Sequence, residues 1–332
     1  MVSSGLSGLI ATDEIQLPRL HMAVGSEIGI LALYRRSLGV PTTHPAGSPR
    51  GALAKLKYLL TTHGVRKSLK TMNVMIEAFA WNIAVLEELG YGDKVVYLAF
   101  GEDIERVRRG IDGERLEELT KRFAPYERAF GWFSRLNFQD TGASSYKGAE
   151  LFLEALLGMP RPIEGGRVAV VIGRHGRDAA AFESRARETW LYPHIQWVDH
   201  LAHDALVTYL SLPWLVLFAE FGDIDDGLSG IGRDAAAVGA VTVSSCQPDV
   251  VARQYGRAAP ILQARTAGDI VARMAETPAM PAAAFAAVRE EMRAFGRECL
   301  DYRARFAPMF VSALKRAIAE FNGKAAPKED AS

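Results

Sequence analysis

The second half of the chain alternates between two patterns of hydrophobic positions. Short continuous apolar runs, typical of strands buried on both faces, are separated by longer stretches with apolar residues at helical spacing. The apolar runs occupy residues 130–134, 168–172, 195–198, 214–219, 241–245 and 260–263. Helices are expected over 148–159, from about residue 177, and over 203–210, 231–238, 249–255 and 267–276. This alternation predicts an α/β fold with a parallel sheet covered by helices on both faces.

The first half predicts a smaller α/β domain. Strands are expected over 20–24, 73–78 and 94–100, and helices over 52–61 and 81–89. The highly charged stretch that follows predicts an interdomain link, and two further helices are expected over 281–295 and 300–321. The predicted organisation is a shortened N-terminal domain (1–105), a link (106–128), a larger α/β domain (129–278), C-terminal helices (279–322) and a disordered tail (323–332).

Composition narrows the class of protein. The 332 residues carry 39 basic and 39 acidic side chains, so the whole-chain charge gives no reason to expect nucleic-acid binding. The two cysteines, Cys246 and Cys299, suggest neither a disulfide framework nor a zinc site, and the sequence shows no metal-binding cluster. The first residues lack the pattern of a signal peptide, and the most apolar stretch, 210–219, is far shorter than the roughly 20 residues that span a bilayer. We expect a cytoplasmic protein.

A glycine-rich segment precedes the helix expected over 231–238. Its glycines let a ligand approach the backbone closely, and the helix N-terminus offers N–H groups to phosphate or sugar oxygens. Asp226 lies in this loop and Asp234 on the first turn of the helix, where each carboxylate could accept hydrogen bonds from sugar hydroxyls. The alternative is an N-cap and a first-turn acid, both common where helices begin.

This segment resembles the donor-binding motif of the retaining family-four glycosyltransferases, in which four residues separate Glu-Gly-Phe-Gly from a second Glu. Asp226 and Asp234 match the two glutamates, and Gly227, Leu228 and Ser229 match Gly-Phe-Gly. Both acids are one methylene shorter than the family's. The resemblance covers about residues 70–277 and implies a GT-B-like fold, in which two Rossmann-like domains face a cleft, with the first domain shortened here.

Two cations precede this motif in the sequence. Arg135 follows the apolar run 130–134, and Lys147 stands before Gly148 at the start of the next helix. Such a pair can hold a diphosphate and neutralise a leaving nucleotide, although two ordinary surface cations are the alternative. The same family carries an Arg and a Lys-Gly at these places. The resemblance therefore implies that Arg135 and Lys147 bind the donor diphosphate.

Histidines give weaker signals. The segment 171–176, which contains His175, resembles the family's glycine turn after its second strand, but a plain βα turn explains it equally well. His21 is a candidate for the histidine that the family's first domain contributes to the catalytic region.

A basic stretch distinguishes the first domain. Residues 28–76 contain no acid, and leucines at helical spacing alternate with basic residues over 53–60. A basic amphipathic helix can lie on an anionic membrane, and a solvated basic face is the alternative. We expect residues 35–70 to be the segment that contacts such a surface.

The resemblance implies an activity. The protein would act as a hexosyltransferase in polysaccharide or glycolipid synthesis, moving a sugar from a nucleotide diphosphate sugar to an unknown acceptor with retention. Arg135 and Lys147 would stabilise the leaving diphosphate, Asp226 and the 227–229 backbone would bind the donor sugar, and Asp234 would bind the ribose. No cofactor or metal is expected, and a second chain or a membrane would complete the cleft. Two alternatives remain open: a non-catalytic glycosyltransferase-like binding protein and a sugar-nucleotide epimerase.

Overall fold

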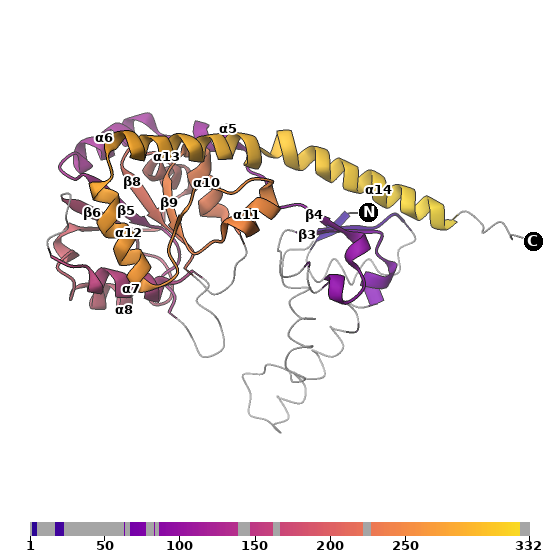
Figure 1. Ribbon diagram of the computed structural model, residues 1–332, viewed down its shortest axis with the longest axis horizontal. Coiled ribbons are helices and arrows are strands. Elements are labelled where there is room, and N and C mark those ends of the chain that lie inside the picture. The colour runs from indigo at the N-terminus through magenta and orange to yellow at the C-terminus, as the bar shows by residue number, and fades with distance from the viewer. Residues whose placement is uncertain are drawn as a thin grey trace, which may run out of the picture. The chain divides into compact units, whose positions relative to one another are not determined.

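The computed structural model of the chain consists of two compact units (Figure 1). One unit comprises Met1–Phe100 and Phe306–Ser332, and the other comprises Gly101–Arg305. The structure describes residues 2–4, 17–22, 63, 67–77, 83, 86–138, 147–161, 167–221 and 227–325.

The second unit is built around a parallel sheet. Its described residues form six strands in the order β10-β9-β8-β5-β6-β7. The strands are β5 (Arg128–Trp132), β6 (Val168–Gly173), β7 (Ile195–Val198), β8 (Leu215–Phe218), β9 (Val241–Ser244) and β10 (Leu262–Gln263). The chain builds outward from β5 in one direction and from β8 in the other, so the strand order reverses between these two neighbours. Ligands of open α/β sheets bind at the carboxyl ends of the strands beside such a reversal.

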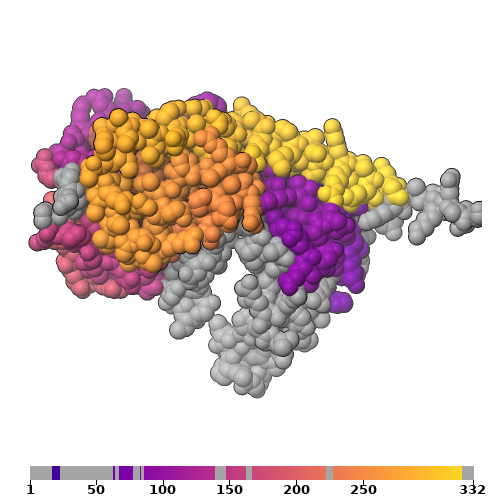
Figure 2. Space-filling model, in the orientation of Figure 1, coloured from indigo at the N-terminus to yellow at the C-terminus, as the bar shows by residue number. Residues whose placement is uncertain are grey.

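Helices cover this sheet in two layers. The helices are α5 (Ile104–Arg109), α6 (Gly113–Phe123), α7 (Ala149–Gly158), α8 (Ala179–Ala186), α9 (His203–Leu210), α10 (Gly230–Val238), α11 (Pro248–Tyr255), α12 (Ala267–Ala279) and α13 (Ala282–Phe295). One layer contains α7 packed between α8 and α12, and the other contains α10 packed on α5, α9 and α13 (Figure 1). The segment from α10 to α13, orange in Figure 2, forms one continuous surface on the face shown. The predicted α/β fold is confirmed.

Aromatic residues fill the core between the sheet and α7. Trp132 at the end of β5 stacks on Phe152 of α7, with ring centroids 4.8 Å apart, and on Phe221 after β8, at 6.0 Å. All six residues of β6 and all four of β8 are buried, which is why these strands are continuous apolar runs in the sequence.

The first unit contains a smaller parallel sheet. Its described residues form β1 (Val2–Ser4), β2 (Leu20–Met22), β3 (Val74–Glu77) and β4 (Val95–Tyr97), in that order across the sheet. The final helix, α14 (Ala307–Ala325), packs on this sheet, since Ala313 and Ala317 join the apolar cluster of Leu20, Val74 and Ile76. The sequence did not predict β1, and the helix expected over 52–61 lies outside the described residues. No helix in the described ranges combines the length and apolarity that crossing a membrane requires.

The compact units are divided differently from the predicted domains. Residues 106–128, expected to be a link, contain the end of α5, all of α6 and the first residue of β5, and they belong to the second unit. The α6 charges lie on its solvent face, because Leu119 and Phe123 are its buried residues, and the Asp112 N–H donates to Thr208 Oγ1 of α9 at 3.0 Å. The C-terminal helices expected over 279–322 are divided between the units, since α13 packs on α10 and α14 on the first sheet.

Candidate functional site

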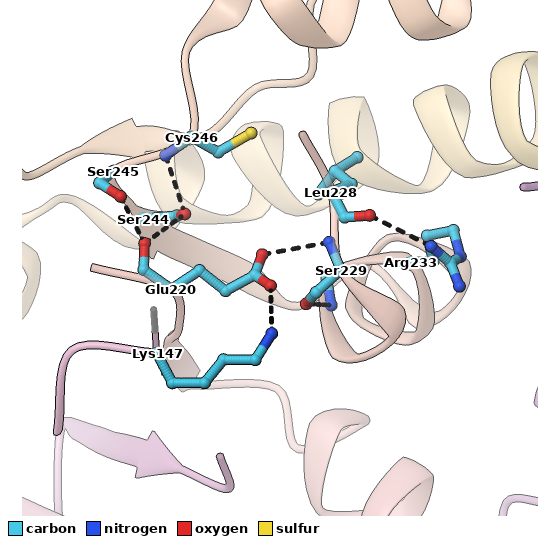
Figure 3. A network of polar contacts seen from close by, with 9 residues as sticks. Lys147, Glu220, Leu228, Ser229, Arg233, Ser244, Ser245 and Cys246 are labelled. Atoms are coloured by element: carbon cyan, nitrogen blue, oxygen red, sulfur yellow. Dashed lines mark hydrogen bonds and ion pairs between the residues drawn. The ribbon is translucent and has the colours of Figure 1, made fainter. Parts of the chain in front are cut away.

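The candidate site lies within the second unit, at the carboxyl ends of β5, β8 and β9. Lys147 stands just before α7, the helix that follows β5, and Glu220 follows β8. Ser229 is the N-cap of α10, the helix that follows Glu220 in the chain. These residues come together at the reversal of strand order (Figure 3).

A carboxylate joins the predicted lysine to the glycine-rich segment. Lys147 Nζ donates to Glu220 Oε1 at 2.9 Å, and the Ser229 N–H donates to Glu220 Oε2 at 3.1 Å (Figure 3). The Lys147 side chain is 24% exposed and that of Glu220 15%, so water screens this ion pair only in part. The Glu220 carboxylate thus lies between a cation and the N-terminus of α10, an arrangement in which proteins commonly bind phosphate.

The backbone of Glu220 is held in an unusual conformation. Its φ of 61° lies in the left-handed region, which non-glycine residues rarely adopt. Its carbonyl oxygen accepts hydrogen bonds from Ser245 N at 3.0 Å, Ser245 Oγ at 2.6 Å and Ser244 Oγ at 3.3 Å. Several contacts of this kind are needed to maintain a strained backbone, and strained residues cluster at functional sites. The strands therefore direct the Glu220 side chain toward Lys147.

Two glycines permit the close approach of these segments. Gly148 has a φ of 72°, and a Cβ at this position would lie 2.5 Å from Phe221 Cβ. The Phe221 N–H donates to the Lys147 carbonyl oxygen at 3.2 Å, which fixes the lysine beside the end of β8. Gly227 has a φ of 79°, and a Cβ there would lie 1.7 Å from Gln254 Oε1. Glycine is needed at both positions for two reasons. A side chain would clash with the neighbouring segment, and the backbone has a positive φ.

Helix α10 begins within the glycine-rich segment, one residue earlier than predicted. The helix starts at Gly230, so Asp234 lies in its second turn and not its first. Ser229 Oγ accepts from the Gly232 N–H at 3.4 Å, Leu228 is buried, and its carbonyl oxygen accepts from Arg233 at 3.1 Å. Asp226, predicted to bind the donor sugar, lies outside the described residues.

Asp234 is buried and has a partner within the protein. Its residue is 7% exposed, and its Oδ1 lies 3.1 Å from Nε2 of His203, the first residue of α9. Burial raises the pKa of the Asp234 carboxyl, and the hydrogen bond and charge of His203 oppose this rise. A ribose hydroxyl that bound here would have to share this carboxylate with His203.

Arg135 lies at a different part of the same edge. It is exposed, and its charge acts on His175, which follows β6. The Leu136 N–H donates to the His175 carbonyl oxygen at 2.8 Å, and the His175 ring centroid lies 5.6 Å from that of His200 after β7. Burial lowers the pKa of His175, and His200 and Arg135 lower it further. The described electrostatics therefore link Arg135 to His175.

Sequence reasoning missed Glu220 and His203. A signal for Glu220 was present, because it is the first charged residue after the apolar run 214–219 and so had to lie at a strand end. His203 gave no such signal, since its partner Asp234 is 31 positions away. Within the described ranges, no cluster of three or more His, Cys, Asp or Glu side chains could hold a metal ion.

Comparison with solved structures identifies the fold. HepE from Anabaena in complex with UDP matches with a TM-score of 0.56 and 11% identity over 96% of this chain and 82% of that chain. The α,α-trehalose 6-phosphate synthase of Burkholderia multivorans has a TM-score of 0.62 and 14% identity, over 96% and 75%. Sucrose-phosphate synthase from Thermosynechococcus elongatus has a TM-score of 0.66 and 13% identity, over 96% and 73%. The chain has the fold of the GT-B glycosyltransferases.

At the level of sequence, neither a protein-family model nor a curated protein matches this chain. The identities to the structural neighbours are too low to transfer an activity directly. The likeness therefore shows the fold, and the residues of the site carry the function.

Proposed function

We propose that this protein is a glycosyltransferase that uses a nucleotide diphosphate sugar as donor. The observation that carries the proposal is the position of Lys147, Glu220 and the α10 N-terminus together at the strand-order reversal of a GT-B-type sheet. Lys147 and the α10 N-terminus would bind the donor diphosphate. HepE, a protein of the same fold, has been crystallised with UDP and with UDP-glucose, which makes a uridine nucleotide the first donor to test.

Charge stabilisation is the chemistry that this arrangement supports. As the glycosidic bond of the donor breaks, negative charge develops on the leaving diphosphate, and a cation beside a helix N-terminus stabilises that charge. Lys147 would supply the cation, and Arg135 would approach the diphosphate from the β5 loop. Retention of configuration and membership of family four belong to this proposal through the match of residues 226–234 to the family motif.

Calorimetric titration with UDP tests the donor site. We expect UDP to bind the full chain. Lys147→Gln should weaken the free energy of UDP binding by about 1.5–3 kcal/mol, the contribution of a charge-assisted hydrogen bond. Arg257→Gln is a matched control, because Arg257 forms an ion pair with Glu298 at 2.7 Å on another part of the second unit. Unchanged UDP affinity in Lys147→Gln would contradict the proposed site.

A second candidate function is donor binding without transfer. It is favoured by the internal pairing of Lys147 with Glu220 and of Asp234 with His203, since both predicted donor contacts have partners within the protein. Turnover separates the two functions. A transferase releases UDP from a UDP-sugar when sugars, sugar phosphates or lipid-linked acceptors are supplied, whereas a binding protein saturates with donor and releases none.

Membrane association of residues 35–70 also remains a proposal. Most of these residues lie outside the described part of the chain. Co-sedimentation with anionic vesicles, lost at high salt and absent with neutral vesicles, would support it.

A further inference from the structure

A cavity lies in the second unit, on the helical layer that contains α5, α10 and α13. It has a volume of about 420 Å³, within the range of small-molecule sites. Three of its lining residues are arginines from two separate parts of the chain, Arg108 of α5, Arg293 of α13 and Arg297 of the π-helical turn Gly296–Leu300. Ile111, Leu116 and Val238 supply an apolar wall.

The contacts of these arginines show that their guanidinium groups converge. Arg108 Nε donates to the Ala237 carbonyl at 3.0 Å, and Arg293 Nε donates to the next carbonyl, that of Val238, at 3.1 Å. Arg293 and Arg297 share one carboxylate, Glu290, at 3.3 and 3.0 Å. The guanidinium groups of Arg108, Arg293 and Arg297 therefore lie around one cavity.

This cluster is rich in positive charge. Glu290 is the one carboxylate that the described ion pairs bring to the three guanidiniums, which leaves an excess of two positive charges. The terminal nitrogens of Arg108 make no hydrogen bond within the described ranges. Hydrogen bonds from Arg297 and Arg293 lower the pKa of the Glu290 carboxyl.

A buried arginine next to the cavity adds to this positive charge. Arg289 is 6% exposed and donates to the Leu212 carbonyl at 2.7 Å, next to the cavity-lining Ser211. Burial and the charge of Arg293 lower the pKa of Arg289 to about 10. An anion in the cavity would relieve this repulsion.

We propose that this cavity binds a small organic phosphate that carries an apolar group. Guanidinium forks match phosphate oxygens in geometry, and an excess of two positive charges matches a dianion better than a carboxylate. The phosphate would take the place of the Glu290 carboxylate between Arg293 and Arg297, and the apolar group would lie against Ile111, Leu116 and Val238. Arg108 and Arg293 use only Nε to cap the last carbonyls of α10. Their terminal nitrogens can therefore bind the phosphate while the cap stays in place.

Titration of the full chain with phenyl phosphate tests this site. Arg297→Gln should weaken binding about tenfold, because it removes one charge-assisted hydrogen bond without touching the α10 carbonyls. Glu290→Gln should tighten binding several-fold, since it removes the competing carboxylate. The control Arg257→Gln should leave binding unchanged, because Arg257 does not line the cavity. It is matched to Arg297 in exposure, 47% against 48% of the side chain, and each forms an ion pair with one glutamate.

Further arms separate this cavity from the donor site and test the apolar wall. Lys147→Gln should leave phenyl phosphate binding unchanged, because Lys147 belongs to the other site. Inorganic phosphate should bind more weakly than phenyl phosphate, and phenol should not bind. The proposal is overturned if the wild type does not bind phenyl phosphate, if Arg297→Gln and Glu290→Gln both leave affinity unchanged, or if affinity falls in Lys147→Gln instead.

Discussion

Replacing Glu220 with glutamine separates two roles for this carboxylate. Glutamine has nearly the same shape, and its carbonyl oxygen can still accept from the Ser229 N–H, but it carries no charge to hold Lys147. If Glu220 competes with the donor diphosphate for Lys147, Glu220→Gln should bind UDP more tightly than the wild type. If Glu220 instead accepts a hydroxyl of the donor sugar, the variant should bind a UDP-sugar more weakly and UDP equally well.

The size of the effect follows from the geometry of the ion pair. Two unit charges 2.9 Å apart attract by about 6 kcal/mol at an effective dielectric constant of 20. Most of this is offset by the hydration that the charges lose, so exposed pairs are worth about 0.2–1 kcal/mol. The Lys147 and Glu220 side chains are 24% and 15% exposed, which places their pair above that range, at about 1–2 kcal/mol. Removal of this competition corresponds to roughly tenfold tighter UDP binding.

Calorimetry on the wild type, Glu220→Gln and a control measures this difference. Glu276→Gln is a suitable control, because Glu276 pairs with Arg273 at 2.6 Å on α12. Chemical denaturation should also show that Glu220→Gln loses about 1–2 kcal/mol of stability with its ion pair. Weaker UDP binding by a folded Glu220→Gln protein would refute competition and would make Glu220 part of the diphosphate site.

Three further predictions concern stability. Gly148→Ala should cost roughly 2–4 kcal/mol in urea denaturation, because its Cβ would lie 2.5 Å from Phe221 at a φ of 72°, whereas Gly113→Ala, with open space around its Cβ, should change stability by less than about 1 kcal/mol. Because the pKa of His175 is lowered in the fold, the wild type should lose stability as pH falls below the ordinary value of 6.5, and His175→Gln should lose less. Thr266→Ala should cost about 1 kcal/mol in thermal unfolding, since it removes the capping box of α12.

The sheet of the second unit could be predicted because of how its strands are buried. A strand covered on both faces admits only apolar residues, so β6 and β8 appear in the sequence as uninterrupted runs. The charged helices α5 and α6 have the composition of a link because most of their surface faces water. Only a few positions, such as Leu119 and Phe123, reveal that α6 packs on the domain.

The pairing of the site residues was beyond sequence reasoning. Lys147 and Ser229 could be placed at helix starts, but the carboxylate between them depends on the left-handed backbone of Glu220, which three long-range hydrogen bonds maintain. Strand ends specify where side chains meet, and not which atoms bond. For the same reason the sequence places Arg135 after a strand, but the effect of its charge on His175 depends on the fold.

A bound donor would have to displace two partners within the protein, Glu220 from Lys147 and His203 from Asp234. These two displacements differ in how strongly the donor can compete. At Lys147 a doubly charged diphosphate competes with a single carboxylate, and it has the advantage in charge. At Asp234 a neutral ribose hydroxyl competes with His203, whose Nε2 already lies 3.1 Å from the buried Oδ1. The diphosphate should therefore supply most of the affinity, and UDP should bind only slightly better than pyrophosphate. His203→Ala would leave Asp234 for the ribose and should widen the ratio between UDP and pyrophosphate affinity in calorimetry. A ratio that is already large in the wild type, and unchanged in His203→Ala, would show that the ribose is bound elsewhere.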